Sequence, residues 1–180
     1  MAIEAVNQMR TFGILVLVVL GSALVAACST TGPRDYRATA TLEPTKGSET
    51  TGTISFLQRG DKTIVHADVR GLKANQEHGF HVHEKGDCSS GDGMSAGGHF
   101  NPDNVAHAGM PGHVGDMPNL KADANGMVHT SFELKTMTIA EGVHSVVGKG
   151  LIIHRDADDY KTQPTGNAGP RLACSVIRAG

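Results

Sequence analysis

The sequence predicts an all-β fold, an eight-stranded Greek-key β-sandwich or flattened barrel that is interrupted by two long functional loops. Three observations predict it. Glycine supplies 23 of the 180 residues, about twice its usual share. No segment carries an apolar period of 3.6 residues over the length of a helix. Short β-like runs alternate instead with turns rich in Gly, Asn, Asp and Pro, as in sandwiches and barrels. The length fits one compact domain.

The first 27 residues predict an export signal of the lipoprotein type. Arg10 precedes the run TFGILVLVVLGSALVAAC, which is apolar but shorter than the about 20 residues of a membrane-spanning helix. Its ending, Val25-Ala26-Ala27-Cys28, resembles the lipobox of bacterial lipoproteins, in which Cys28 would be lipidated. The alternative is an ordinary signal peptide cut nearby. We expect a tether over residues 28–35, a domain over residues 36–180, and an exported protein of the periplasm or cell envelope, lipid-anchored to a bacterial membrane.

Eight runs of the domain are predicted as strands because each is short, rich in apolar or β-branched residues and bounded by turn residues. In chain order they are Tyr36–Leu42, Thr51–Gln58, Lys62–Val69, His78–Glu84, Gly115–Ala122, Met127–Leu134, Val147–His154 and Leu172–Ile177. The stretch Lys135–Val146 is expected to cross between two sheets. Two long loops remain, residues 85–114, rich in Gly and His, and residues 155–171, rich in Asp, Thr and Gly. Loops of that length inside a compact domain are usually either functional or disordered.

Charge and cysteine content narrow the function classes. Sixteen basic and eighteen acidic side chains give a net charge of -2, so the chain has no basic surplus to neutralise nucleic-acid phosphates. Beyond Cys28, the domain contains only Cys88 and Cys174. Two cysteines in an exported domain suggest a disulfide, with free thiols as the alternative.

Two histidines in one predicted strand indicate a binding site. His81 and His83 alternate with Phe80 and Val82, and side chains two residues apart on a strand share a face. Both imidazoles therefore reach one side while Phe80 and Val82 face the core. Such a pair alone is as compatible with surface histidines. His154, which ends the apolar run Gly150–Ile153, stands at a loop mouth where it would complete a site with this pair.

A second group of potential ligands follows in and just after the first long loop, within a span of eighteen residues. His99, His107, His113 and Asp116 have the spacing H-x7-H-x5-H-x2-D, and three imidazoles with one carboxylate match tetrahedral zinc chemistry. A loop with few apolar anchors is costly to order by packing, whereas a divalent ion can organise it. The alternative is a solvated loop with scattered histidines.

Five segments in the same order resemble the copper-zinc superoxide dismutases, in particular the bacterial exported, lipoprotein-like members. The segments are GFHVHEKGD (79–87), AGGHFNP (96–102), HVGDMPNL (113–120), VVGKGLIIH (146–154) and TGNAGPRLACSVI (165–177). The resemblance implies one copper ion and one zinc ion per subunit. It assigns copper to His81, His83, His99 and His154, and zinc to His99, His107, His113 and Asp116. His99 would bridge the two ions as an imidazolate and take part in catalysis.

The same resemblance assigns roles around the metals. Asp158 matches the aspartate that links a copper histidine to a zinc histidine. Arg171 matches the catalytic arginine that attracts superoxide, and Thr165 matches a residue that narrows the substrate channel. Lys161 is the nearest substitute for the steering charges of a loop that is shorter here than in animal members. The disulfide would join Cys88 to Cys174, although Cys88 lies only five residues after His83, as in bacterial exported members.

The function implied is dismutation of superoxide to dioxygen and hydrogen peroxide by a redox-cycling copper, as antioxidant defence in the cell envelope. The alternative is a lipid-anchored protein that sequesters copper or zinc without turnover. Arg171, Thr165 and Asp158 favour the enzyme, because storage has no use for an anion-attracting channel. A sandwich that had lost its metals would lack a copper ligand, and all four are present. The sequence leaves a monomer and a homodimer open.

Overall fold

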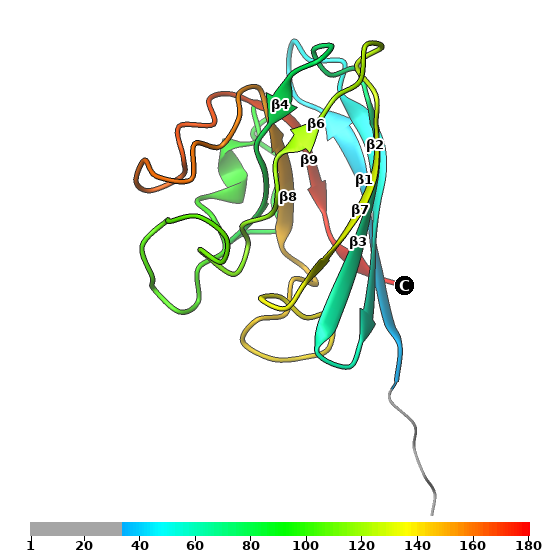
Figure 1. Cartoon of the computed structure of the whole chain (residues 1–180), viewed down its shortest axis with the longest axis vertical. Coiled ribbons are helices and arrows are strands. Elements are labelled where there is room, and N and C mark those ends of the chain that lie inside the picture. The colour runs from blue at the N-terminus through cyan, green and yellow to red at the C-terminus, as the bar shows by residue number, and fades with distance from the viewer. Residues whose placement is uncertain (1–33) are drawn as a thin grey trace, which may run out of the picture. The chain divides into compact units, whose positions relative to one another are not determined.

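The computed structural model describes residues 34–180 (Figure 1), so the predicted signal segment, Cys28 and most of the tether lie outside the described residues. The described residues group as one compact unit. Its framework is one antiparallel sheet with the strand order β5-β8-β9-β1-β2-β3-β7, in which β10 also pairs with β1. The strands are β1 (Tyr36–Pro44), β2 (Thr51–Arg59), β3 (Lys62–Arg70), β5 (Phe80–His83), β7 (Val128–Leu134), β8 (Gly150–His154), β9 (Arg171–Val176) and β10 (Arg178–Ala179). A two-stranded sheet joins β4 (Glu77–His78) to β6 (Leu120–Lys121), and a short 3-10 helix, η1, spans Met94–Ala96.

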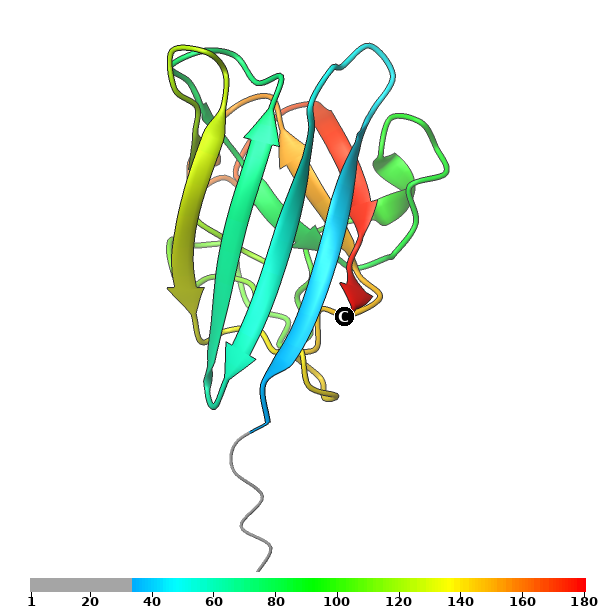
Figure 2. The same cartoon turned by 90° about the vertical axis from the view of Figure 1, so that its right-hand side faces the viewer.

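The sheet curls so that two groups of strands face each other. Figure 2 shows β7, β3, β2 and β1 side by side in front of the more steeply crossing β8 and β9. The all-β fold class predicted from the sequence is therefore confirmed. Within the described residues, no helix is long and apolar enough to cross a membrane.

The core lies between these two groups of strands. On β3, buried Thr63, Val65, Ala67 and Val69 alternate with more exposed neighbours, which is the two-residue period of a strand with one face in the core. β5 differs, because Phe80, His81, Val82 and His83 are all buried. Phe80 and Val82 belong to the core cluster. The alternating histidines must therefore lie under the loops on the other face of β5.

Most predicted strands appear at nearly their predicted bounds, and the differences have local causes. The strand expected over His78–Glu84 is interrupted at Gly79, whose N–H donates to Asp156 O (2.8 Å) and whose carbonyl accepts from His154 N–H (2.8 Å). A Cβ at Gly79 would lie 2.8 Å from the Ala168 Cβ. Gly79 is thus the point where the second long loop crosses the sheet.

The segment Gly115–Ala122 is a strand only over β6. Its first part runs along β5 instead, where Val82 N–H donates to Gly115 O (2.9 Å) and a Cβ at Gly115 would lie 2.3 Å from Val82 O. The strand predicted from Val147 begins at Gly150, after a turn in which Gly148 has a φ of 80°. β10 was not predicted, because two exposed residues carry no periodic pattern. Both long loops remain outside the strands except for Arg171, the last residue of the second, which begins β9, and η1 lies in the first.

Candidate metal centre

Two adjacent strands and the first long loop bring four imidazoles together. β5 carries His81 and His83 on one face, and β8 pairs antiparallel with β5 so that His81 lies opposite Ile152. Residues opposite each other in an antiparallel pair share a face, so His154, two residues beyond Ile152, projects to the same side. His99 reaches this side from the first long loop, where its backbone forms an isolated antiparallel β-bridge with the backbone of His83.

The first ligand group consists of His81, His83, His99 and His154, all buried, with ligand atoms within 4.8 Å of one another. The Nε2 atoms of His83 and His154 are 3.3 Å apart. The ring centroids of His81 and His99 are 3.9 Å apart. Four imidazoles at this distance, with no carboxylate among them, form a ligand set for a transition-metal ion.

The second ligand group consists of His99, His107, His113 and Asp116, again buried and within 4.8 Å. The Asp116 carboxylate lies at its centre: Oδ1 is 2.8 Å from His99 Nδ1 and Oδ2 is 3.0 Å from His107 Nδ1. His113 Nδ1 is 3.5 Å from Oδ1. His99 belongs to both groups, with Nδ1 directed to the second and Nε2 available to the first.

Backbone carbonyls fix the tautomers of two histidines in the first group. His83 Nδ1–H donates to Gly97 O (2.9 Å), and His154 Nδ1–H donates to Gly169 O (3.1 Å). A carbonyl oxygen only accepts, so the proton of each neutral ring is on Nδ1 and the lone pair is on Nε2. Each Nε2 lone pair is therefore directed toward the other ring, ready to bind an ion.

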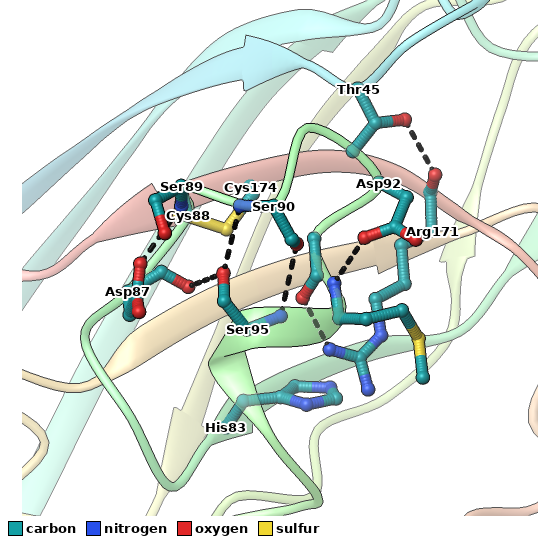
Figure 3. The surroundings of a disulfide bond; sticks show 12 residues. Thr45, His83, Asp87, Cys88, Ser89, Ser90, Asp92, Ser95, Arg171 and Cys174 are labelled. Carbon is teal, nitrogen blue, oxygen red and sulfur yellow. Dashed lines mark hydrogen bonds between the residues drawn. A yellow bond between two sulfur atoms is a disulfide. The ribbon is translucent and has the colours of Figure 1, made fainter.

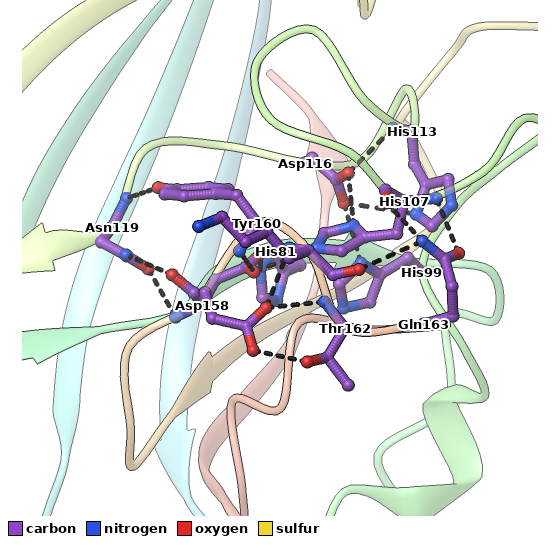
Figure 4. Close-up of polar contacts among 12 residues, drawn as sticks. His81, His99, His107, His113, Asp116, Asn119, Asp158, Tyr160, Thr162 and Gln163 are labelled. Carbon is purple, nitrogen blue, oxygen red and sulfur yellow. Dashed lines mark hydrogen bonds and ion pairs between the residues drawn. The ribbon is translucent and has the colours of Figure 1, made fainter.

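The Asp158 carboxylate likewise fixes the tautomer of one histidine in each group (Figure 4). Its Oδ2 accepts from His81 Nε2–H (2.8 Å) and its Oδ1 from His107 Nε2–H (2.9 Å), so that Nδ1 is the nitrogen that each ring directs to its ligand group. Although burial acts to raise the pKa of the Asp158 carboxyl, the hydrogen bonds from His81 and His107 lower it well below its usual range. Asp158 is thus an ionised, buried link between the two groups.

The two groups fit metal ions on a structural test. His81 Nδ1 and His99 Nε2 are buried, and neither has a hydrogen-bond partner among residues 34–180. Buried polar atoms without partners are costly, and these two are directed into the first ligand group. The same applies to His113 Nδ1 in the second group, which is only in ion-pair range of Asp116. A metal ion at each group supplies the missing partners.

Burial keeps three histidines of the first group neutral. It lowers the pKa of His81 to about 4 and that of His154 to about 3, and it lowers the pKa of His83 well below its usual value. Metal ligation requires the unprotonated ring, so these histidines are prepared to bind an ion near neutral pH without first losing a proton.

Arg171 stands beside the first group. It begins β9, and its guanidinium donates to Gly93 O and, at 2.6 Å, to Gly97 O. Gly97 O is also the acceptor for His83, so one carbonyl holds both the cation and a ligand ring. Arg171 is half-buried and its guanidinium is held in place by these hydrogen bonds. A permanent positive charge therefore lies next to the four imidazoles.

The predicted disulfide is confirmed. Cys88 and Cys174 are joined, with Cα atoms 5.8 Å apart, and Figure 3 shows the bond near Arg171 and His83. Cys174 lies three residues after Arg171 on β9, and Cys88 belongs to the loop that carries the Gly93 and Gly97 carbonyls. The disulfide therefore ties the carbonyls that hold Arg171 to the strand that carries it.

The remaining predicted residues belong to the second long loop. Thr165 is half-buried and precedes Gly166, where a Cβ would lie 1.7 Å from Asp158 Oδ1 and 2.8 Å from His107 Nε2. That part of the loop therefore packs directly on the Asp158 link. Lys161 is exposed, and within residues 34–180 no ion pair involves its ammonium group. Its side chain is not brought to either ligand group.

Several groups around the site were not singled out from the sequence. The carbonyls of Gly93, Gly97 and Gly169 could not be, because any residue supplies a carbonyl; positive φ values of 77°, 76° and 73° are their only local signal. Asn119 exchanges two hydrogen bonds with the Asp158 backbone (2.9 and 3.0 Å), and its N–H donates to the Tyr160 hydroxyl (2.8 Å).

Comparison with known proteins gives a consistent result. The sequence profile of the copper/zinc superoxide dismutase family matches residues 50–177. A superoxide dismutase [Cu-Zn] of Aquifex aeolicus is 36% identical over 168 residues, 89% of this chain and 96% of that protein. An extracellular superoxide dismutase [Cu-Zn] of Caenorhabditis elegans is 38% identical over 183 residues, 94% of this chain and 78% of that one. The crystal structure of a SOD-like protein from Bacillus subtilis superposes with a TM-score of 0.70 at 33% identity, covering 77% of this chain and 96% of that chain.

Proposed function

Because this chain belongs to the copper/zinc superoxide dismutase family, we propose that its two ligand groups divide the family's metals between them. Copper is held by His81, His83, His99 and His154, and zinc by His99, His107, His113 and Asp116. An all-imidazole set suits a copper ion that alternates between two oxidation states, whereas three imidazoles with a carboxylate suit redox-inert zinc. The observation that carries the assignment is that both groups share the ring of His99. Its Nε2 belongs to the copper group and its Nδ1 to the zinc group.

The activity is dismutation of superoxide to dioxygen and hydrogen peroxide, and the protein is an oxidoreductase with copper and zinc as cofactors. Copper supplies the one-electron redox chemistry. The chain's own residues supply charge, position and protons. Arg171, held by two carbonyls beside the first group, attracts the superoxide anion and orients it, and its pKa, lowered by burial, still leaves it charged.

His99 is the residue we assign to proton transfer. Its Nδ1 is anchored at Asp116, and its Nε2 has no hydrogen-bond partner among the described residues. The ring could therefore take up a proton at Nε2 whenever that nitrogen is not bound to copper, and return it to the reduced substrate without turning. Reduction of superoxide to hydrogen peroxide needs two protons, and His99 Nε2 is placed to supply the first.

We further propose that the protein is exported and lipid-anchored through Cys28, with residues 1–27 as the signal, 28–35 as the tether and 36–180 as the catalytic domain. The lipobox-like Val25-Ala26-Ala27-Cys28 supports the anchor, and the family includes a member named extracellular. A disulfide in the domain is in keeping with an oxidising compartment. Mass spectrometry of the protein purified from membranes tests the anchor: an unmodified Cys28 would refute it.

The competing function is metal sequestration without turnover, which the ligand groups alone would serve. Superoxide decay is measured with purified protein whose copper and zinc contents are determined in the same sample, with His154→Ala as the control. Decay that follows copper occupancy and disappears in the control establishes the enzyme together with its copper site. Arg171→Ile should slow the decay and weaken its dependence on salt, because the steering charge is removed. Both metals bound with decay no faster than in buffer would establish sequestration.

A further inference from the structure

Behind the second ligand group, the side chain of Gln163, on the second long loop, contacts the backbone of His107, on the first. The Gln163 amide oxygen accepts from the His107 backbone N–H (2.9 Å), and its amide nitrogen donates to the His107 carbonyl (Figure 4). A primary amide has both a donor and an acceptor in one plane, so it pairs with the two polar groups of a single residue as a neighbouring strand would. The loops are also joined here by the hydrogen bond from Gly109 N–H to Tyr160 O (2.9 Å) and by the contact of the His107 ring with Asp158 (2.9 Å).

The segment around His107 is held at Val105 by the Asn101 side-chain amide (2.8 and 3.1 Å) and at Gly109 by Tyr160 O, so at His107 itself the backbone depends on Gln163. His107 lies outside strands and helices, and its neighbours Ala106 and Ala108 are exposed. Among residues 34–180, the His107 backbone makes no hydrogen bond to another backbone group. The His107 ring is fixed on both sides, by Asp116 and by Asp158, but its main chain is held by Gln163.

We propose that Gln163 is a positioning residue for zinc: its side-chain amide latches the backbone of the zinc ligand His107 to the second long loop. The proposal rests on the assignment of the second ligand group to zinc. Gln163 is exposed, so it gains little from burial at this position. Two of its side-chain hydrogen bonds go to His107, and the third, to Lys161 O, is longer (3.4 Å). The latch keeps the His107 ring within reach of the ion between binding events, which slows zinc release.

The amide is the necessary group, since each alternative loses one half of the pairing. Gln163→Ala removes both hydrogen bonds. Gln163→Glu keeps the length of the side chain and the acceptor for the His107 N–H, but it places a second carboxylate oxygen against the His107 carbonyl. Both variants should therefore release zinc faster, although the glutamate fills the same volume as the glutamine.

Thr162→Ala is the matched control. Thr162 is the adjacent residue, it is exposed, and its hydroxyl donates to Asp159 Oδ2 (2.6 Å) within the same turn. Removing that hydroxyl loosens the turn without removing a contact to His107. General destabilisation of the loop is thereby separated from loss of the latch.

Zinc release is measured by transferring zinc from the purified metal-loaded protein to an excess of a chromogenic chelator at neutral pH. Loss of a group that supports a metal ligand typically costs 10-fold to 100-fold in affinity, so we expect release about 10-fold faster or more in Gln163→Ala and Gln163→Glu, and a change below about twofold in Thr162→Ala. With cobalt(II) in place of zinc, the visible ligand-field spectrum should change in the two Gln163 variants and not in the control.

Release at the wild-type rate with an unchanged cobalt spectrum in both Gln163 variants would overturn the latch, and so would equally fast release from Thr162→Ala. A wild-type protein that holds no zinc would overturn the ligand assignment beneath it. The assay contains no superoxide, so failure of the latch leaves the dismutase activity standing.

Discussion

Asp158→Asn tests how the two metal sites are linked, because it keeps the shape of the carboxylate and removes one acceptor. Oδ1 of Asp158 accepts two hydrogen bonds, from His107 Nε2–H (2.9 Å) and Tyr160 N–H (2.7 Å), whereas Oδ2 accepts one, from His81 Nε2–H (2.8 Å). The asparagine oxygen should take the Oδ1 position, since it satisfies two donors there. Its NH2 group then faces His81 Nε2, and the His81 ring must move its proton to Nδ1, the atom that would bind copper.

The magnitude follows from that single lost bond. A hydrogen bond to a charged group contributes about 1.5–3 kcal/mol, which corresponds to copper binding that is about 10-fold to 150-fold weaker. Zinc binding should weaken less, because the His107 hydrogen bond survives with a neutral acceptor. The order of the two losses is the specific prediction, since it depends on which oxygen of Asp158 carries two donors.

Copper and zinc affinities of the variant are measured by competition with a chelator of known affinity, each metal in turn. Asp159→Asn is the control, because Asp159 is exposed and its carboxylate accepts only from Lys161 and Thr162 in its own turn. Copper affinity equal to wild type would refute the tautomer argument. A larger loss of zinc than of copper would refute the orientation assigned to the amide.

Three further predictions concern stability and packing. Replacing Cys88 and Cys174 by serine removes a disulfide that spans a sequence separation of 86. Chain entropy predicts that the free energy of unfolding, measured in urea, falls by about 4–5 kcal/mol. A loss below about 1 kcal/mol would contradict an entropic origin. In the metal-free protein, the pKa of His81 is lowered to about 4, so between pH 6.5 and 4 the unfolded chain binds a proton that the folded chain does not. Stability should therefore fall with pH in that window, by about 1.4 kcal/mol per pH unit for this residue, and equal urea midpoints at pH 7 and pH 5 would exclude it. Gly166→Ala places a Cβ 1.7 Å from Asp158 Oδ1 at a φ of 67°, so the purified variant should retain its sheet by circular dichroism but lose metal, whereas full metal content would show that the loop can give way.

The sequence predicts the strands well where one face is buried and the other exposed. β1, β2 and β3 begin at their predicted residues, because the turns between them are marked by residues such as Gly47 and Gly60. The sequence predicts the strands poorly where their boundaries depend on contacts with residues far away in the chain. The break at Gly79 depends on hydrogen bonds to Asp156 and His154, which no local pattern announces.

The candidate site shows the same division. The residue types and spacing of His99, His107, His113 and Asp116 carry chemistry that can be recognised from the sequence. The choice of ring nitrogen cannot, because it depends on carbonyls such as Gly97 O and Gly169 O, which are contributed by position in space and by no particular side chain. Gln163 was missed for a related reason: it acts on a backbone, and nothing in the sequence says which backbone.

The shared ring of His99 joins two ligand groups of very different span along the chain. The zinc group runs from His99 to Asp116, a separation of 17 residues, whereas the copper group runs from His81 to His154, a separation of 73 and dependent on pairing of β5 with β8. Closing the longer segment costs about 1 kcal/mol more by chain entropy alone. Zinc can therefore gather its ligands early in folding, while the copper ligands assemble only when the sheet is formed. Zinc binding then orders the first long loop and positions the shared ligand His99. Copper therefore binds to a group in which one of the four ligands is already in place.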